Sequence, residues 1–233
     1  MMRDRYVIIM AAGSGNRMGA ELPKQFLELE GKAILHKTME AFLEAVPDVK
    51  IITVLPEDYI NYWKEYCLRR SFICPQVLVK GGITRFHSVK NALSKVPEGA
   101  LVAVHDGVRP LVSPSFLEDM FTKAESLDAL IPVLPCIDTM KVLRMDGSVL
   151  RSEPGVEADR SVLYGAQTPQ IFRSELLKEA YHQPFSPSFT DDASVVERYG
   201  KSLSYIIGER LNIKITTQED LVLARAICSL REN

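Results

Sequence analysis

The chain has 233 residues, of which 28 are basic and 30 acidic, and its formal net charge is −2. This balance excludes the general basic field on which nonspecific nucleic-acid binding depends, so any anion site has to be local. The length fits one large α/β domain or two small ones, and either could bury a substantial core.

Cysteine and histidine usage argues against a zinc site and against a disulfide scaffold. The four cysteines include no C-x-x-C, and no histidine stands at metal-ligand spacing. We expect reduced thiols in a cytoplasmic protein and structural roles for the histidines, of which only His105 lies beside a suspected site. The apolar run from Tyr6 to Ala12 is too short for a signal-peptide core, and no segment approaches the length of a membrane span.

The most informative segment is an apolar run, Val7–Met10, that leads into a glycine loop. Without a Cβ, Gly13 and Gly15 allow phosphate oxygens to approach the main chain. A Gly-x-Gly turn also has an ordinary structural explanation. However, Arg17 and Lys24 add two cations at the mouth of this loop, which a turn does not need and a polyphosphate does.

Two common phosphate-binding motifs are absent from this loop. Met18 stands where a dinucleotide-binding G-x-G-x-x-G would have its third glycine, which argues against a nicotinamide-dependent reductase. The chain also lacks the Gly-Lys-Ser/Thr of a Walker loop. A non-catalytic nucleotide-binding module remains the other alternative, and the presence of both Arg17 and Lys24 argues against it.

Short apolar runs then alternate with amphipathic stretches, which predicts a mainly parallel sheet covered on both faces, a Rossmann-like three-layer sandwich. The further predicted strands are Ile51–Leu55, Val77–Val79, Leu101–Val104 and Ala129–Val133. The predicted helices cover Arg85–Val96, a segment opened by Ser113-Pro114, and a terminal segment that a Thr216-x-x-Glu219 capping box opens and that runs to about Leu230.

One segment departs from the alternation. From Asp138 to about Arg160 there is no helical period, and Asp146-Gly147 between short apolar runs predicts a protruding β-hairpin. An isolated hairpin is barely stable in water, so we expect this arm, at about 138–160, to make a dimer contact. No linker or repeat divides the chain, which we therefore interpret as a single domain over 1–233 with a dimerisation arm.

A second polar cluster follows the strand at 101–104. Ligands of open parallel sheets bind at the carboxyl ends of strands, where Asp106 and Arg109 fall. The Asp106 carboxylate suits a hard cation such as Mg²⁺, and Arg109 suits a second anion. The alternative is that the two residues form a surface salt bridge in a turn.

Other polar groups collect at later strand ends, and each has an ordinary explanation when taken singly. Thr190, for example, could be the N-cap of a helix through Glu197. Counted together they favour phosphoryl or nucleotidyl transfer, which needs many cations around one small volume. They comprise Gly81-Gly82 with Arg85 and Ser88, Asp138–Lys141, Arg160, Thr168–Gln170, Thr190–Asp192 and Asn212–Lys214.

Seven spaced blocks resemble the 2-C-methyl-D-erythritol 4-phosphate cytidylyltransferase family, in order and over nearly the whole chain. The blocks are Ala11-Ala12-Gly13-x-Gly15-x-Arg17-Met18 with Pro23-Lys24-Gln25, Gly81-Gly82-x-x-Arg85-x-x-Ser88-Val89, His105-Asp106-x-x-Arg109-Pro110, Asp138-Thr139, Thr168-Pro169-Gln170, Thr190-Asp191-Asp192-Ala193-Ser194 and Asn212-Ile213-Lys214. The resemblance implies an enzyme that makes CDP-methylerythritol and pyrophosphate from CTP and methylerythritol phosphate, in the non-mevalonate isoprenoid pathway.

The resemblance also implies a role for each matching residue. The residues implied for CTP are Ala11, Ala12, Gly13, Gly15, Arg17, Lys24, Gly82, Ser88 and Asp106, and Asp106 would also meet Mg²⁺. Those implied for the sugar-alcohol phosphate are Asp106, Arg109, Thr139, Arg160, Thr190 and Lys214. The catalytic set would be Arg17, Lys24, Arg160 and Lys214, with Arg160 reaching from the arm into the neighbouring subunit of a homodimer. The attacking group is an anionic phosphate oxygen, so no general base is needed.

Two departures and one rival accompany this resemblance. Gly107 stands where the family commonly has alanine, and a more flexible backbone there could alter how Asp106 is presented. Ile83-Thr84 stand where acidic residues are often seen. The rival is a ribitol or ribulose 5-phosphate cytidylyltransferase, which shares the glycine loop and the Asp-x-x-Arg-Pro block. The segment Thr190–Glu197 favours methylerythritol phosphate as the substrate.

Overall fold

The computed structural model of the chain describes residues 3–13 and 22–231. Gly15 and Arg17, two of the predicted site residues, lie outside the described residues. The described part forms an eight-stranded sheet with the order β10-β7-β11-β6-β1-β4-β5, and β12 pairs with β7. Its strands are β1 (Arg5–Met10), β4 (Lys50–Leu55), β5 (Gln76–Lys80), β6 (Leu101–Asp106), β7 (Ala129–Pro135), β10 (Tyr164–Ala166), β11 (Gln170–Arg173) and β12 (Ser204–Ile207).

The sheet is mainly parallel and β1 lies in its interior, between β4 and β6. Ile8 of β1 is in register with Ile52 of β4 on one side and Val104 of β6 on the other, and both pairings are parallel. β5 and β12 extend the sheet in parallel pairs, whereas β11 and β10 pair antiparallel. The carboxyl ends of β1, β4, β5 and β6 therefore meet at one edge of the sheet, where ligands of such folds bind.

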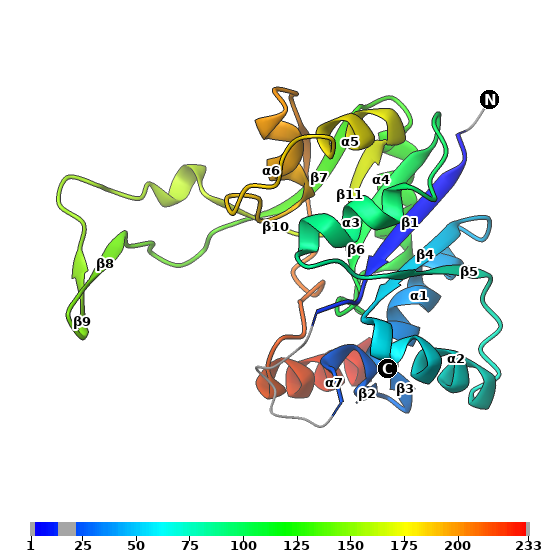
Figure 1. The fold of residues 1–233 in the computed structure, drawn as a ribbon. Helices are drawn as coiled ribbons and strands as arrows, with labels where there is room; N and C mark the ends of the chain where they lie inside the picture. The colour runs from blue at the N-terminus through cyan, green and yellow to red at the C-terminus, as the bar shows by residue number, and fades with distance from the viewer. Residues whose placement is uncertain (1–2, 14–21, 232–233) are drawn as a thin grey trace.

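Helices cover both faces of the sheet, which gives the three layers (Figure 1). The described helices are α1 (Ile34–Ala45), α2 (Ile60–Arg69), α3 (Arg85–Leu93), α4 (Pro114–Ala124), α5 (Ser174–Ala180), α6 (Asp192–Arg198) and α7 (Gln218–Arg231). Shorter elements are the 3₁₀ turns η2 (Lys24–Phe26), η3 (Glu57–Tyr59) and η4 (Arg160–Val162), and the strand pairs β2 (Glu28–Leu29) with β3 (Lys32–Ala33) and β8 (Leu143–Asp146) with β9 (Val149–Ser152).

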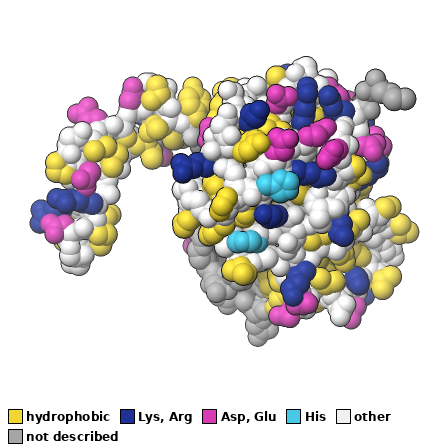
Figure 2. Space-filling view, turned by 45° about the horizontal axis from the view of Figure 1, so that its top comes forward, with side chains coloured by type: hydrophobic (Ala, Val, Ile, Leu, Met, Phe, Trp, Pro, Cys, Tyr) yellow, Lys and Arg dark blue, Asp and Glu magenta, His cyan; other side chains and the backbone are white. Residues whose placement is uncertain are grey.

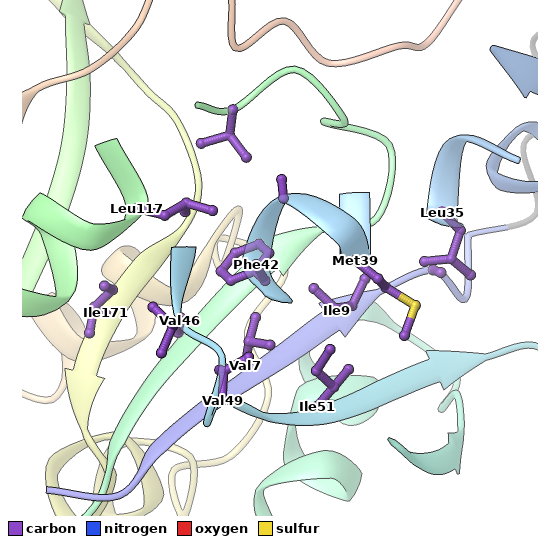
Figure 3. Packing of buried hydrophobic residues seen from close by; sticks show 14 of the residues in the cluster. Val7, Ile9, Leu35, Met39, Phe42, Val46, Val49, Ile51, Leu117 and Ile171 are labelled. Atoms are coloured by element: carbon purple, nitrogen blue, oxygen red, sulfur yellow. The ribbon is translucent and has the colours of Figure 1, made fainter. Parts of the chain in front are cut away.

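Successive residues of β1 are buried in different layers because side chains alternate across a strand. Val7 and Ile9 belong to the cluster that α1, α2 and α4 cover, and they lie under Met39 and Phe42 of α1 in Figure 3. Ile8 belongs to the opposite cluster, under α3, α5 and α6. A strand buried on both faces reads as an unbroken apolar run, which explains why Val7–Met10 is so apolar in the sequence.

Most predicted elements are confirmed. All five apolar runs are strands, and Ser113 is the N-cap of α4, where its Oγ accepts a hydrogen bond from the Phe116 N–H at 3.2 Å. α3 begins at Arg85 as predicted but ends at Leu93 rather than Val96. Pro97 follows Val96, and the residue before a proline disfavours helical geometry.

Two helix caps lie one residue later than the residues considered from the sequence. The box that opens α7 is formed by Thr217 and Asp220, one residue later than the predicted Thr216 and Glu219. The cap of α6 is Asp191, whose carboxylate accepts from the Ser194 N–H at 2.8 Å, and Thr190 stands before it. In each case two adjacent polar residues could cap the helix, and the sequence does not distinguish them.

The predicted arm extends away from the body of the molecule (Figure 1). Its strands β8 and β9 pair antiparallel with Asp146 opposite Val149, so the two turn residues are Gly147 and Ser148 rather than Asp146 and Gly147. Gly147 has a φ of +63°, a conformation that favours glycine. Figure 2 shows hydrophobic side chains along the arm. The large exposed apolar residues of this segment include Met140, Leu143, Met145, Val149 and Leu150.

None of the described helices has the length and apolar character needed to cross a bilayer.

Candidate active site

A cleft of about 450 Å³ opens at the edge of the sheet where β1, β5 and β6 end. The described residues that line it are Met10, Ala11, Ala12, Gly13, Lys24, Gln25, Gly82, Ile83, Thr84, Arg85, Ser88, Asp106, Val108 and Lys214. They come from segments far apart in the sequence, which parallel strand ends bring to one place. This is the edge at which the sequence predicts the ligand site.

The two glycines after β5 are required by close packing. A Cβ on Gly81 would lie 2.6 Å from the Cβ of Ala12, and one on Gly82 would lie 2.5 Å from the Cβ of His87. The Gly82 N–H donates to the Ser88 Oγ at 2.9 Å. Because no side chain stands between them, the segment after β5 packs directly on the loop after β1 and closes one side of the cleft.

Gln25 is a site residue for which the sequence pattern predicts no role. Its side chain is buried, and its Nε2 donates to the carbonyl of Ala11 at 2.7 Å and to that of Gly13 at 3.4 Å. Gln25 follows Lys24 in η2, so these two hydrogen bonds hold the lysine segment against the loop after β1. A glutamine directly after a predicted site lysine was the available signal.

Asp106 lies at the centre of a cluster of cations. Its Oδ2 is 3.1 Å from the Nε of Arg109 and 3.1 Å from the Nζ of Lys214. The Asp106 and Arg109 side chains are each 11% exposed, so the pair is not the surface salt bridge of the alternative interpretation. Burial alone would raise the pKa of Asp106, but Lys214, Arg85 and Arg109 together hold it well below its usual value. Asp106 is therefore a carboxylate at neutral pH.

Backbone pairing brings Lys214 to this carboxylate. The Ile215 N–H donates to the Val108 carbonyl at 2.9 Å, which fixes the segment before α7 beside the turn after β6. Arg109 is held from the same side, because its Nη1 donates to the Asn212 carbonyl at 2.7 Å. The motif Asn212–Lys214 thus meets Asp106 through main-chain contacts.

His105 is buried behind this cluster and both ring nitrogens have partners. Nδ1 lies 3.1 Å from the Thr168 Oγ1, and Nε2 lies 3.1 Å from the Arg109 carbonyl. Burial lowers the pKa of His105 to about 4, so the ring is neutral at pH 7. The Thr168 Oγ1 also accepts from the Asp106 N–H at 3.1 Å. His105 therefore supports the position of the neighbouring carboxylate.

The structure brings together most of the predicted site residues that it describes. Those that line the cleft are Ala11, Ala12, Gly13, Lys24, Gly82, Ser88, Asp106 and Lys214, and Arg109 lies directly beside them. Three others are placed elsewhere on the same chain. Thr139 is exposed near the base of the arm, Arg160 donates to the Ile137 carbonyl at 2.9 Å, and Thr190 borders a separate cavity next to β10 and β12.

The two departures from the family pattern have different surroundings. A Cβ on Gly107 would lie 3.1 Å from the Ala11 Cβ and 3.1 Å from the Met10 carbonyl oxygen, and the Gly107 N–H donates to that oxygen at 2.9 Å. Glycine here allows close packing under the loop after β1. Ile83 is 96% exposed at the edge of the cleft.

The residues present fit a metal ion only if phosphate oxygens and water supply most of its ligands. Within residues 3–13 and 22–231, no group of three or more histidine, cysteine, aspartate or glutamate side chains is placed to hold a metal. Asp106 is the one carboxylate among the described lining residues. Mg²⁺ commonly binds through one or two carboxylates and completes its shell with phosphate oxygens and water. A magnesium ion bound to a nucleotide is consistent with this donor set.

The fold and the cleft define the class of protein. A Rossmann-like sheet, a loop after β1 backed by a lysine, and a carboxylate among cations at the strand ends are the parts of a nucleotidyltransferase.

Comparisons with known proteins agree with this class. The family described as 2-C-methyl-D-erythritol 4-phosphate cytidylyltransferase matches residues 6–230. The enzyme of that name from Porphyromonas gingivalis is 45% identical over 228 residues, which cover 97% of this chain and 99% of the relative. The one from Phocaeicola vulgatus is 44% identical over 225 residues, which cover 96% and 99%.

Solved structures lead to the same family. The cytidylyltransferase of that name from Francisella tularensis aligns with a TM-score of 0.78 and 30% identity, covering 96% of this chain and 99% of the other. The 4-diphosphocytidyl-2C-methyl-D-erythritol synthase from Anaerococcus prevotii aligns with a TM-score of 0.78 and 29% identity, covering 97% and 96%. The chain belongs to the 2-C-methyl-D-erythritol 4-phosphate cytidylyltransferase family.

Proposed function

We propose that this protein transfers CMP from CTP to 2-C-methyl-D-erythritol 4-phosphate and releases pyrophosphate. The observation that carries the proposal is the cleft itself, in which Lys24 and Lys214 approach the loop Ala11–Gly13 and the Asp106 carboxylate. The family to which the chain belongs supports the choice of substrates.

The reaction needs charge stabilisation more than acid–base chemistry. A phosphate oxygen of the acceptor attacks the α-phosphorus of CTP, a new phosphorus–oxygen bond forms, and the bond from the α-phosphorus to the pyrophosphate oxygen breaks. The nucleophile is already anionic, so no base has to remove a proton. Fixed cations around the transferring phosphoryl group stabilise most of the charge in the transition state of such reactions. Lys24 and Lys214 can supply these cations without reorganisation.

We further propose the roles implied for the two residues outside the described part and for the metal ion. Arg17 would bind the triphosphate together with Lys24, and Gly15 would line the same loop. Mg²⁺ would bind Asp106 and the phosphate oxygens and, when bound, would neutralise part of their charge.

The second substrate calls for residues from a partner. Thr139 and Arg160 lie on or next to the arm, outside the cleft of their own chain. We propose a homodimer in which the arm of each subunit brings these two residues to the cleft of the other, while Arg109, Thr190 and Lys214 act from the same chain as the nucleotide site. We also propose a cytoplasmic location, because the four cysteines, all of them among the described residues, form no disulfide.

Pyrophosphate release tests the function directly. Purified protein is given CTP and Mg²⁺ with methylerythritol phosphate, ribitol 5-phosphate or ribulose 5-phosphate as the acceptor. We expect rapid release with methylerythritol phosphate and little with the other two. Faster release with ribitol or ribulose phosphate would identify the rival activity, and no release with any acceptor would refute the proposal.

A further inference from the structure

A buried ion pair joins the nucleotide side of the cleft to the start of α6. The Nη2 of Arg85 lies 2.5 Å from the Oδ2 of Asp192, and the Tyr181 hydroxyl donates to the Oδ1 of the same carboxylate at 2.6 Å. Asp192 is 0% exposed and Tyr181 is 1% exposed. Both carboxylate oxygens thus have a partner, one of which lines the cleft.

Aromatic stacking reinforces the same contact. Phe86, the residue after Arg85, stacks on Tyr181 with ring centroids 4.6 Å apart and on Phe189 with centroids 5.5 Å apart. The first turn of α3 is therefore fixed to the segment 181–192 by packing and by charge. The segment 81–84, which borders the cleft, leads directly into this turn.

The other end of the ion pair is fixed as firmly. Asp191 accepts from the Nε2 of Gln170 at 2.8 Å, and the Oε1 of Gln170 accepts from the Ala193 N–H at 2.9 Å. Gln170 is buried and belongs to β11, so the start of α6 is tied to the central sheet. Thr190, one of the residues proposed for the acceptor, immediately precedes this tied segment.

We infer that Arg85, Asp192 and Tyr181 form a positioning unit that sets the cleft segment 81–84 at a fixed place relative to Thr190. The unit thereby holds the two substrates at the separation that bond formation requires. A misplacement of about 1 Å between reacting groups can cost on the order of a hundredfold in rate. The inference rests on the proposed function, because it assigns the nucleotide to one side of the unit and the acceptor to the other.

The experiment measures kcat and both KM values for variants that fold. Arg85→Met removes the charge but keeps most of the side-chain length, and Asp192→Asn removes the charge but keeps the side-chain shape. The double variant completes a double-mutant cycle. We expect each single change to lower kcat at saturating CTP and methylerythritol phosphate by about tenfold, and the double variant to be no less active than the less active single variant, because the residues act as a unit. Tyr181→Phe keeps the stack on Phe86 and should produce a smaller change of the same kind.

A second ion pair, more exposed and remote from the cleft, supplies the control. Arg173 and Asp128 lie 3.1 Å apart near the opposite ends of the strands, where Arg173 is in register with Leu101. Asp128→Asn should leave kcat and both KM values at the wild-type level. A role confined to holding α6 would lower the melting temperature of Asp192→Asn and leave its kcat unchanged, which would overturn the inference.

Two further outcomes are decisive. Multiplying losses in the double variant, or an effect of Arg85→Met that Asp192→Asn does not share, would show that Arg85 acts alone and would refute the unit. If Asp192→Asn does not fold, Arg85→Met and Tyr181→Phe each still remove one partner of the carboxylate, and wild-type constants in both would refute the unit equally. Wild-type protein that is inactive with all three acceptors would instead count against the proposed function.

Discussion

Lys24 and Lys214 are the lysines that line the described part of the cleft, and they reach it from opposite ends of the chain. Lys214 contacts Asp106, whereas Lys24 is placed by the hydrogen bonds of the neighbouring Gln25. Lys24 is the lysine proposed to bind the triphosphate itself, so its substitution tests the proposed chemistry most directly.

We expect Lys24→Ala to lower kcat by about a hundredfold or more with the fold intact, as for the loss of a preorganised transition-state donor. Steady-state kinetics with pyrophosphate detection measures the loss, and circular dichroism checks the fold. Lys32→Ala is the control, because Lys32 pairs with Glu40 at 2.7 Å and does not line the cleft. A near-normal kcat in Lys24→Ala would show that Lys24 does not stabilise the polyphosphate in the transition state.

The buried ring of His105 makes stability depend on pH. Its pKa of about 4 in the folded protein lies below the ordinary value near 6.5 of the unfolded chain. Between those values the unfolded chain binds more protons, so stability rises with pH and is lost as the pH falls from about 6.5 to 4. The contribution lost across that window is up to about 3 kcal/mol, since one pKa unit is worth about 1.4 kcal/mol.

Urea unfolding at pH 7 and pH 5 checks this expectation. His105→Gln should be less stable than the wild type at pH 7 and should lose less of its remaining stability on acidification. Burial also lowers the pKa of His36, so a smaller dependence of the free energy of unfolding on pH remains in both proteins. The exposed His182 provides the control His182→Gln, which should follow the wild type. Equal pH slopes in wild type and His105→Gln would contradict the assignment of a neutral buried ring.

At the scale of elements, α7 connects the site to the rest of the fold. Leu221, Ala224 and Ile227 of α7 pack in one cluster with Val108, the residue that pairs with Ile215 beside Lys214. The start of this helix depends on Asp220, whose Oδ2 accepts from the N–H groups of Thr216 and Thr217 at 2.8 and 2.9 Å. The cap therefore stabilises the segment that carries Lys214.

We expect Asp220→Ala to lower the free energy of unfolding by about 1 kcal/mol, the usual cost of a lost helix cap. Glu219→Ala should have a smaller effect, because the structure assigns the box to Thr217 and Asp220. Urea unfolding of the two variants makes the comparison. A larger loss from Glu219→Ala would restore the box that the sequence pattern favours.

Elements buried on a regular period could be predicted from the sequence, and specific polar contacts could not. The run Val7–Met10 identifies β1 because both faces are buried, and the strand ends then locate Asp106 at the cleft. Gln25 and Asp192 have no such signature, because a buried polar side chain is explained only by partners distant in sequence, here Ala11 and Arg85. The choice between Thr216 and Thr217 as a cap also depends on local geometry that composition does not encode.

At the scale of the whole molecule, the arm leaves its apolar side chains largely uncovered by the rest of its own chain. Leu150, Met145 and Val149 are each more than half exposed, and among the strands that the structure describes β8 and β9 pair only with each other. A two-stranded hairpin of this kind is marginal in water, so a partner that covers it would stabilise it. The second copy of the chain is the partner in our proposal.

We expect Leu150→Asp, which places a charge on the covered surface, to weaken the dimer without unfolding the body of the subunit. Sedimentation velocity over a concentration series measures the association, and far-ultraviolet circular dichroism reports on the body. Arg144→Asp, at an arm residue paired with Glu153, tests whether any charge change on the arm has this effect. A wild-type protein that sediments as a monomer at all concentrations would refute the dimer.

Complementation between two inactive variants tests whether Arg160 acts across the dimer. Arg160→Ala should impair the use of the sugar phosphate more than the affinity for CTP, and Lys24→Ala should lose turnover. In a mixed dimer, the cleft with an intact Lys24 receives the arm with an intact Arg160, while the other cleft carries both defects. Random exchange of subunits should therefore restore about a quarter of the wild-type activity, because half of the dimers are mixed and each has one intact site. Mixing that restores nothing, when exchange is verified by differently tagged subunits, would show that Arg160 does not act across the dimer.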